Sequence, residues 1–157
     1  MDTKRSSKIL KIGKADRNGI IYLKNSAVTI EGIKIWGSPV TPYFLGMAFN
    51  KRRGEAIRKI WQQIPSDTDI LITHGPPFGV RDKKVGCEEL LTQVGKLQPK
   101  IHVFGHVHGE YGVSTAHHNH DKNVKTTTLY NVALTDSIDY LQTGTHKIVL
   151  TPVVIYL

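Results

Sequence analysis

The chain has 157 residues, of which 39% are hydrophobic and 22% are charged, so a collagen, a coiled coil and a wholly disordered chain are excluded. This length suits one domain of ordinary size, with a core that needs no disulfides. The 21 Lys and Arg residues against 13 Asp and Glu give a net charge of +8, which favours anionic partners such as nucleic acid, phosphorylated small molecules or a membrane surface.

Cysteine content and hydropathy predict a cytoplasmic protein. Cys87 is the single cysteine, so an internal disulfide cannot form, and we expect a buried or incidental thiol instead of a nucleophile. No stretch approaches the roughly 20 apolar residues of a membrane span, and we expect neither a signal peptide nor a membrane partner.

The predicted elements begin after a polar, Lys-rich lead-in over residues 1–19. Residues 27–36 alternate apolar and polar side chains around Gly32, which predicts two strands joined by a turn. Residues 50–64 carry one apolar stripe at helical spacing, and Pro65 ends the helix that this stripe predicts.

The middle of the chain predicts a strand–helix–strand unit. Residues 69–73 and 100–104 are short apolar runs typical of buried strands. Residues 87–98 between them have apolar side chains at helical spacing. Such a crossover connection makes the two strands parallel in one sheet.

The last part of the chain is predicted to be β-rich. We expect short strands near residues 111–115, 125–132 and 146–155, and a polar hairpin or loop over residues 116–123. All the elements together predict an α/β fold, in the form of an α+β sandwich, as a single domain over residues 20–157.

A histidine follows each of the two predicted parallel strands. His74 follows residues 69–73, His106 follows residues 100–104, and His108 comes two residues later. Ligands gather at the carboxyl ends of parallel strands, and residues i and i+2 of an extended segment face the same side. Three histidines in this pattern favour a metal site over the alternative of hydrogen-bonded structural residues.

Two motifs extend this pattern, THGPP at residues 73–77 and GHVH at residues 105–108. They resemble the last two motifs of the calcineurin-like metallophosphoesterases. Residues 33–39 and 85–91 make the chain similar to the metallophosphoesterase-domain (MPPED) branch, over roughly residues 20–155. The resemblance implies a βα-sandwich with divalent metal ions (Mn, Fe or Zn) and hydrolysis of phosphomonoesters or phosphodiesters.

Site residues follow from the matching motif positions. The resemblance implies that His74 and His106 bind one metal ion and that His108 binds the other. It implies that Gly75 and Gly105 shape the rim of the site.

Two further residues have their own interpretations. Ser38 precedes Pro39 and is either a residue that approaches substrate phosphate or a turn residue. His102 points to the face opposite Ile101 and Val103, which favours a structural role over metal ligation.

The upstream motifs of the resembled family have no counterpart here. D-x-H, G-D and G-N-H do not occur, and the N-H-D of residues 119–121 follows GHVH and is expected on a solvated loop. Three neutral imidazoles cannot offset two dications, so one metal ion is expected in place of a full dinuclear site. We therefore predict the C-terminal part of a calcineurin-like sandwich, without its N-terminal motif half and without an identified catalytic residue.

The resulting functional prediction is a metal-dependent hydrolase of small phosphoesters, truncated and of limited activity alone. One alternative is a non-catalytic metallophosphoesterase-like binding or regulatory module. Another is a basic nucleic-acid-binding domain, which rests only on the net charge. The missing strands predict an exposed sheet edge or face, and hence a homo-oligomer or pairing with the missing N-terminal half in trans.

Overall fold

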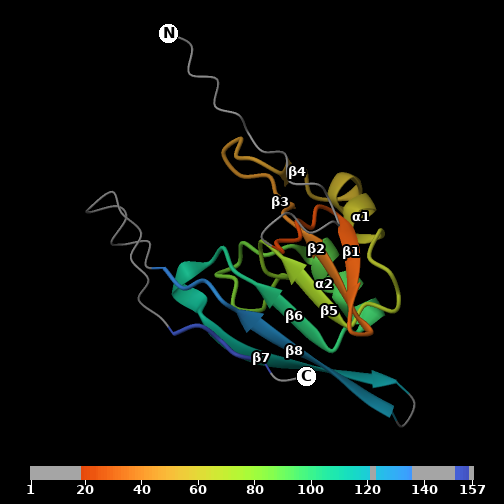
Figure 1. The fold of residues 1–157 in the computed structure, drawn as a ribbon. Coiled ribbons are helices and arrows are strands. Elements are labelled where there is room, and N and C mark those ends of the chain that lie inside the picture. Colours follow the sequence, from red (N-terminus) through yellow and green to blue (C-terminus); the bar gives the residue numbers. More distant parts are fainter. Residues whose placement is uncertain (1–18, 121–122, 136–150, 156–157) are drawn as a thin grey trace.

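The computed structural model describes residues 19–120, 123–135 and 151–155, and these form a six-stranded mixed sheet (Figure 1). The four central strands run parallel to one another, and the outermost strand on each side is antiparallel to its neighbour. In spatial order the strands are β1 (Ser26–Ile30), β2 (Ile33–Ser38), β5 (Ile70–Thr73), β6 (Ile101–Phe104), β8 (Asn123–Asn131) and β7 (Gly112–His120).

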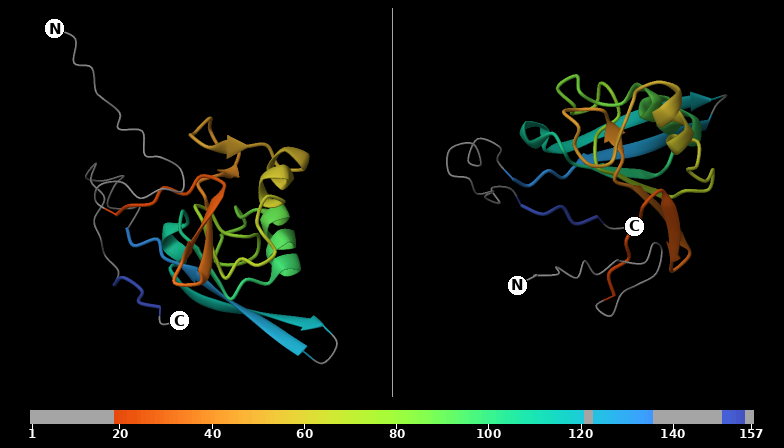
Figure 2. Two further views of the ribbon diagram at one scale, coloured as in Figure 1. Left: turned by 45° about the vertical axis from the view of Figure 1, so that its right-hand side comes forward. Right: turned by 90° about the horizontal axis from the view of Figure 1, so that it is seen from above.

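Two helices cover one face of this sheet, as Figure 2 shows. They are α1 (Glu55–Trp61) and α2 (Glu88–Leu97), and a short 3-10 helix, η1 (His108–Glu110), follows β6. Neither α1 nor α2 is long and apolar enough to cross a membrane, and the described ranges contain no other helix that is. A small parallel pair, β3 (Thr41–Pro42) and β4 (Asn50–Lys51), lies before α1.

The core lies between the helices and the sheet. Trp36 of β2 and Trp61 of α1 meet edge to face with their ring centroids 6.4 Å apart, and both are 1% exposed. Cys87 is buried beside them and its Sγ accepts a hydrogen bond from Trp61 Nε1 at 3.3 Å. The prediction of a buried thiol is confirmed, and burial raises the pKa of Cys87.

The strand–helix–strand prediction is confirmed, since β5 and β6 are parallel and α2 connects them. The first helix is shorter than the sequence predicts. Asn50 and Lys51 pair with β3 instead of starting the helix, and Gly54, with φ 82°, separates them from Glu55, where the helix begins. The tertiary pairing therefore overrides the helical pattern at residues 50–54.

The β7–β8 hairpin is longer than predicted. Of the polar hairpin or loop expected over residues 116–123, the structure shows the hairpin, in which residues 116–120 continue β7 and each pairs with a residue of β8. Residues 151–155 have no regular secondary structure, so the strand predicted near 146–155 is absent from its described part. The predicted lead-in, apart from Gly19, lies outside the described residues, as do residues 136–150.

The second face of the sheet is apolar and only partly covered. Ile72 of β5 pairs with Val103 of β6, which pairs with Tyr130 of β8, which pairs with Val113 of β7, so the four side chains form one row. Ile72 is 41% exposed and Val113 is 46% exposed. This row provides an apolar surface on the side opposite the helices.

Candidate functional site

The carboxyl ends of three parallel strands bring the candidate site together. The backbone N–H of His74 donates to the carbonyl of Ser38 at the end of β2, and the N–H of Gly105 donates to the carbonyl of His74, both at 3.1 Å. His74 Nε2 then lies 3.1 Å from His106 Nδ1, with the ring centroids 4.9 Å apart. The structure therefore places two of the three predicted ligands in contact.

The backbone of His106 is strained in a way that the sequence does not reveal. Its φ of 69° lies in the left-handed region that favours glycine, whereas neighbouring Gly105 and Gly75 do not use that region. A Cβ added to Gly75 or Gly105 would make only ordinary contacts. The left-handed conformation at this turn is thus adopted by His106 and not by the two glycines, and such strain is typical of functional sites.

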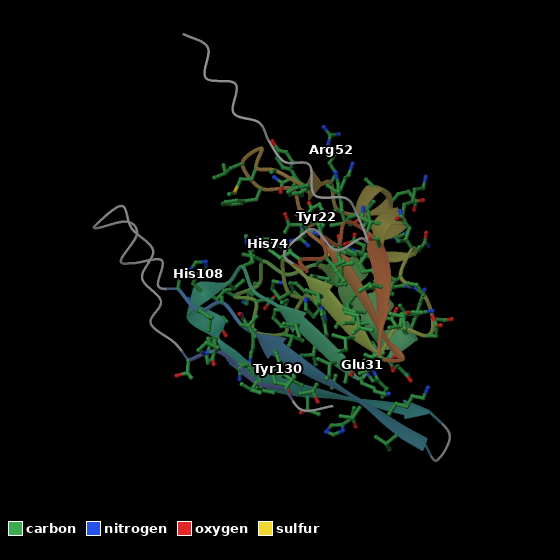
Figure 3. The ribbon with its side chains drawn as sticks, viewed as in Figure 1. Tyr22, Glu31, Arg52, His74, His108 and Tyr130 are labelled. Carbon is green, nitrogen blue, oxygen red and sulfur yellow. The ribbon has the colours of Figure 1, made fainter. Side chains whose placement is uncertain are left out.

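His108 lies close to the pair but has a different partner. Its Nδ1 is 2.9 Å from Thr135 Oγ1, and Figure 3 shows His108 at the same end of the sheet as His74. Burial is the largest cause that lowers the pKa of His74 and His106, and the charge of His108 lowers both further. The pair is therefore neutral near pH 7, which is the form of imidazole that binds metals.

The side chains present fit one metal ion better than two. Within the described ranges, no group of three or more His, Cys, Asp or Glu residues is placed to hold a metal ion. His74 and His106 supply two converging nitrogens and no carboxylate, which suits a single divalent ion and not a dinuclear centre. Of the N-H-D at residues 119–121, Asn119 and His120 pair with Val124 and Asn123 of β8, and Asp121 lies outside the described residues.

A buried hydrogen-bond chain supports the turn that carries His74. Thr73 Oγ1 donates to the carbonyl of Gly75 at 2.7 Å and lies 2.9 Å from His102 Nε2. Because the hydroxyl proton is donated to Gly75, the nitrogen of His102 must donate to the Thr73 oxygen. His102 is fully buried, and its Nδ1 has no hydrogen-bond partner. The structural role predicted for His102 is confirmed.

Ser38 has the contacts of a turn residue. Its Oγ donates to Asn25 Oδ1 at 2.7 Å and accepts from the N–H of Val40 at 3.1 Å, and the side chain is 5% exposed. It lines a shallow hollow together with His74.

Ser38→Ala is expected to lower the free energy of unfolding by about 1–2 kcal/mol, because both hydrogen bonds are lost in a buried position. Metal binding should stay unchanged. Urea denaturation measures the first effect, with the exposed Ser66→Ala as the control that should change stability by less than about 0.5 kcal/mol. A stability equal to that of the wild type would contradict the structural role.

The loop between β5 and α2 is held by residues for which the sequence carries little signal. The buried Asp82 carboxylate accepts the N–H groups of Gly79, Lys84 and Gly86. Arg81 donates to Ser114 Oγ and to backbone carbonyls of β7 and its preceding residue. Gly79 and Gly86 around an aspartate indicate a turn, but not the tertiary contacts of Arg81.

Cationic and aromatic side chains surround the histidine pair. One hollow is lined by His106, Phe44, Arg53 and Lys84, and an adjacent hollow is lined by His74, His106 and Phe44. Arg53 donates to the carbonyls of Val85 and Gly86, which fixes its guanidinium at the rim. The rim therefore presents positive charge next to two neutral imidazoles.

Known proteins are similar to part of this chain. No family model matches the chain. The chain is 51% identical over 100 residues to metallophosphoesterase domain-containing protein 1 of Homo sapiens, a match that covers 59% of this chain and 31% of the human protein. The chain is a homologue of the metallophosphoesterase domain-containing proteins.

Two further relatives show a similar level of identity. Two UPF0046 proteins of Caenorhabditis elegans are 41% and 43% identical over 98 and 101 residues, covering 60% of this chain in each case. The matches cover 33% and 26% of those proteins, so the chain spans about a quarter to a third of the length of such relatives. The resemblance to the metallophosphoesterase-domain branch is confirmed.

Proposed function

We propose that this chain contributes the imidazole ligands of a metal centre that hydrolyses a small phosphoester. The observation that carries the proposal is the 3.1 Å contact between His74 Nε2 and His106 Nδ1 at the ends of adjacent parallel strands. The names of the homologous proteins support the same class of enzyme. A bound divalent ion (Mn, Fe or Zn) would polarise a phosphoryl oxygen and stabilise negative charge.

The chain's own residues would bind and orient the phosphoester. The guanidinium of Arg53 is already fixed by two backbone carbonyls, so little side-chain entropy is lost when an anion approaches it. Exposed Lys84 lines the same hollow and adds a second positive charge. Phe44 lines both hollows and adds an apolar surface beside the imidazoles.

Hydrolysis requires carboxylate ligands that the described residues do not supply at this site. We propose that they come from another polypeptide, either a second copy or an N-terminal half in trans, packed on the sheet face around Ile72 and Val113. A cytoplasmic location, consistent with the buried thiol of Cys87, belongs to the same proposal. The incomplete ligand set also favours the alternative of a non-catalytic phosphate-binding module.

A chimera separates the enzyme from this alternative. The aligned segment of the human relative is replaced by the corresponding segment of this chain, and Mn-dependent hydrolysis of bis(4-nitrophenyl) phosphate is measured after the unmodified human protein is shown to be active. We expect the chimera to hydrolyse the ester and His106→Ala to abolish the activity. A chimera whose activity is unaffected by His106→Ala would contradict the proposed role of the pair.

A further inference from the structure

The loop between β3 and β4 exposes a cluster of large apolar side chains, which we name the apolar loop (residues 43–49). A soluble surface seldom leaves contiguous apolar side chains in water unless they bind a partner. The exposed members are Tyr43 at 63%, Phe44 at 58%, Leu45 at 80%, Met47 at 60% and Phe49 at 45%.

The fold imposes the shape of this loop. Asn50 Nδ2 donates to the carbonyl of Phe44 at 2.7 Å, and Thr41 Oγ1 donates to Asn50 Oδ1 at 2.9 Å, so polar groups tie its base. Leu45 and Phe49 have φ values of 46° and 60°, which are strained for bulky residues. Strain of this kind persists where the surrounding structure holds it and is concentrated at functional segments.

Positive charge surrounds the apolar loop. Residues 32–54 contain no Asp or Glu, and exposed Lys51 and Arg52 follow the loop directly. Figure 3 shows the Arg52 side chain pointing away from the body of the molecule at the end that carries the loop. Lys24 Nζ lies 5.6 Å from the ring centroid of Phe49, which adds another cation at the base.

We propose that the apolar loop inserts into the headgroup region of an anionic lipid bilayer, with Lys51 and Arg52 on the lipid headgroups. Aromatic rings favour the membrane–water interface, and basic side chains beside them favour anionic lipid. The loop projects from the fold (Figures 1 and 2), whereas a stable protein interface needs a broad face of about 800 Å² per partner.

This proposal changes one expectation from the sequence. The absence of an apolar span predicts that no segment crosses a membrane, but insertion of a loop tip requires no span. Phe44 lines both hollows beside the histidine pair, so a docked membrane would lie next to the candidate site.

Vesicle co-sedimentation of the full chain tests the proposal. We expect binding to phosphatidylcholine vesicles that contain phosphatidylserine, weaker binding as salt rises, and little binding to phosphatidylcholine alone. The double variant Phe44→Ser with Leu45→Ser should bind at least about tenfold less. Val124→Ser removes an equally exposed apolar side chain from the distant hairpin and should bind like the wild type.

Two double variants of equal net charge distinguish contact of Lys51 and Arg52 with the lipid from general attraction between a positively charged protein and anionic vesicles. Lys51→Ala with Arg52→Ala should weaken binding about 30-fold. Lys96→Ala with Lys125→Ala leaves the same net charge but removes exposed cations elsewhere, and should have a much smaller effect. Equal losses in the two double variants would overturn a docked orientation.

Insertion itself is measured with Phe44→Trp and brominated lipid. Trp36 and Trp61 are each 1% exposed, so quenching by the vesicles reports on the new indole. We expect strong quenching. The proposal is overturned if the chain does not bind anionic vesicles, or if it binds them without quenching of the new indole. It is also overturned if the Phe44→Ser/Leu45→Ser variant changes oligomeric state and not lipid binding. That last result would assign the loop to a protein contact.

Discussion

Gly86→Ala is expected to lower the free energy of unfolding by about 3 kcal/mol, one of the two largest effects we predict. A Cβ at this position would lie 2.6 Å from the carbonyl oxygen of Pro77 and 2.7 Å from Asp82 Oδ2. The Pro77 contact is backbone, and Asp82 is held by three N–H groups, so neither neighbour can move without breaking other hydrogen bonds. The loop beside the candidate site would be distorted.

Gly95→Ala is the matched control for this substitution. Gly95 lies in α2, and an added Cβ would meet nothing within 4 Å. Alanine should therefore stabilise the helix by about 0.5–1 kcal/mol. Urea denaturation of both variants measures the contrast, and equal stability of Gly86→Ala and the wild type would show that the loop between β5 and α2 is not closely packed.

Acid should destabilise the protein through His102. Burial lowers the pKa of His102 from 6.5 to about 3 in the folded state. Below pH 6.5 the unfolded chain binds a proton that the folded chain excludes, so stability falls as pH decreases from about 6.5 toward 3. Between pH 7 and pH 5 this one group should remove about 2 kcal/mol.

A variant without a titratable side chain at position 102 measures how much His102 contributes to the loss of stability in acid. His102→Gln removes the imidazole, so the fall in stability between pH 7 and pH 5 should shrink by about 2 kcal/mol, although the variant is less stable at pH 7. His117→Gln, at an exposed position on β7, should keep the wild-type pH dependence. An unchanged pH dependence in His102→Gln would mean that the pKa of His102 is the same in the folded and unfolded states.

Local patterns predict the part of the fold that carries the histidines. The apolar runs at residues 69–73 and 100–104 are strands because their side chains are buried, and the helical spacing at 87–98 makes their connection a crossover. Parallel strands end at one edge of a sheet, so the proximity of His74 and His106 follows from the sequence alone.

Non-local contacts account for what the sequence did not predict. Residues 116–120 extend β7 only because β8 provides partners in register, and Asn50 and Lys51 leave the predicted helix to pair with β3. The contact of Arg81 with Ser114, 33 residues away, and the left-handed backbone of His106 also depend on the folded structure. Periodicity carries no information on such contacts.

Titration calorimetry of the metal-free chain with Zn²⁺ or Mn²⁺ tests the central claim most directly. We predict one ion bound per chain, and an affinity at least about 100-fold lower in both His74→Ala and His106→Ala. His117→Ala, which removes an exposed imidazole from β7, should leave the affinity unchanged. Absence of binding, or binding that survives His106→Ala, would contradict the assignment of the pair as metal ligands.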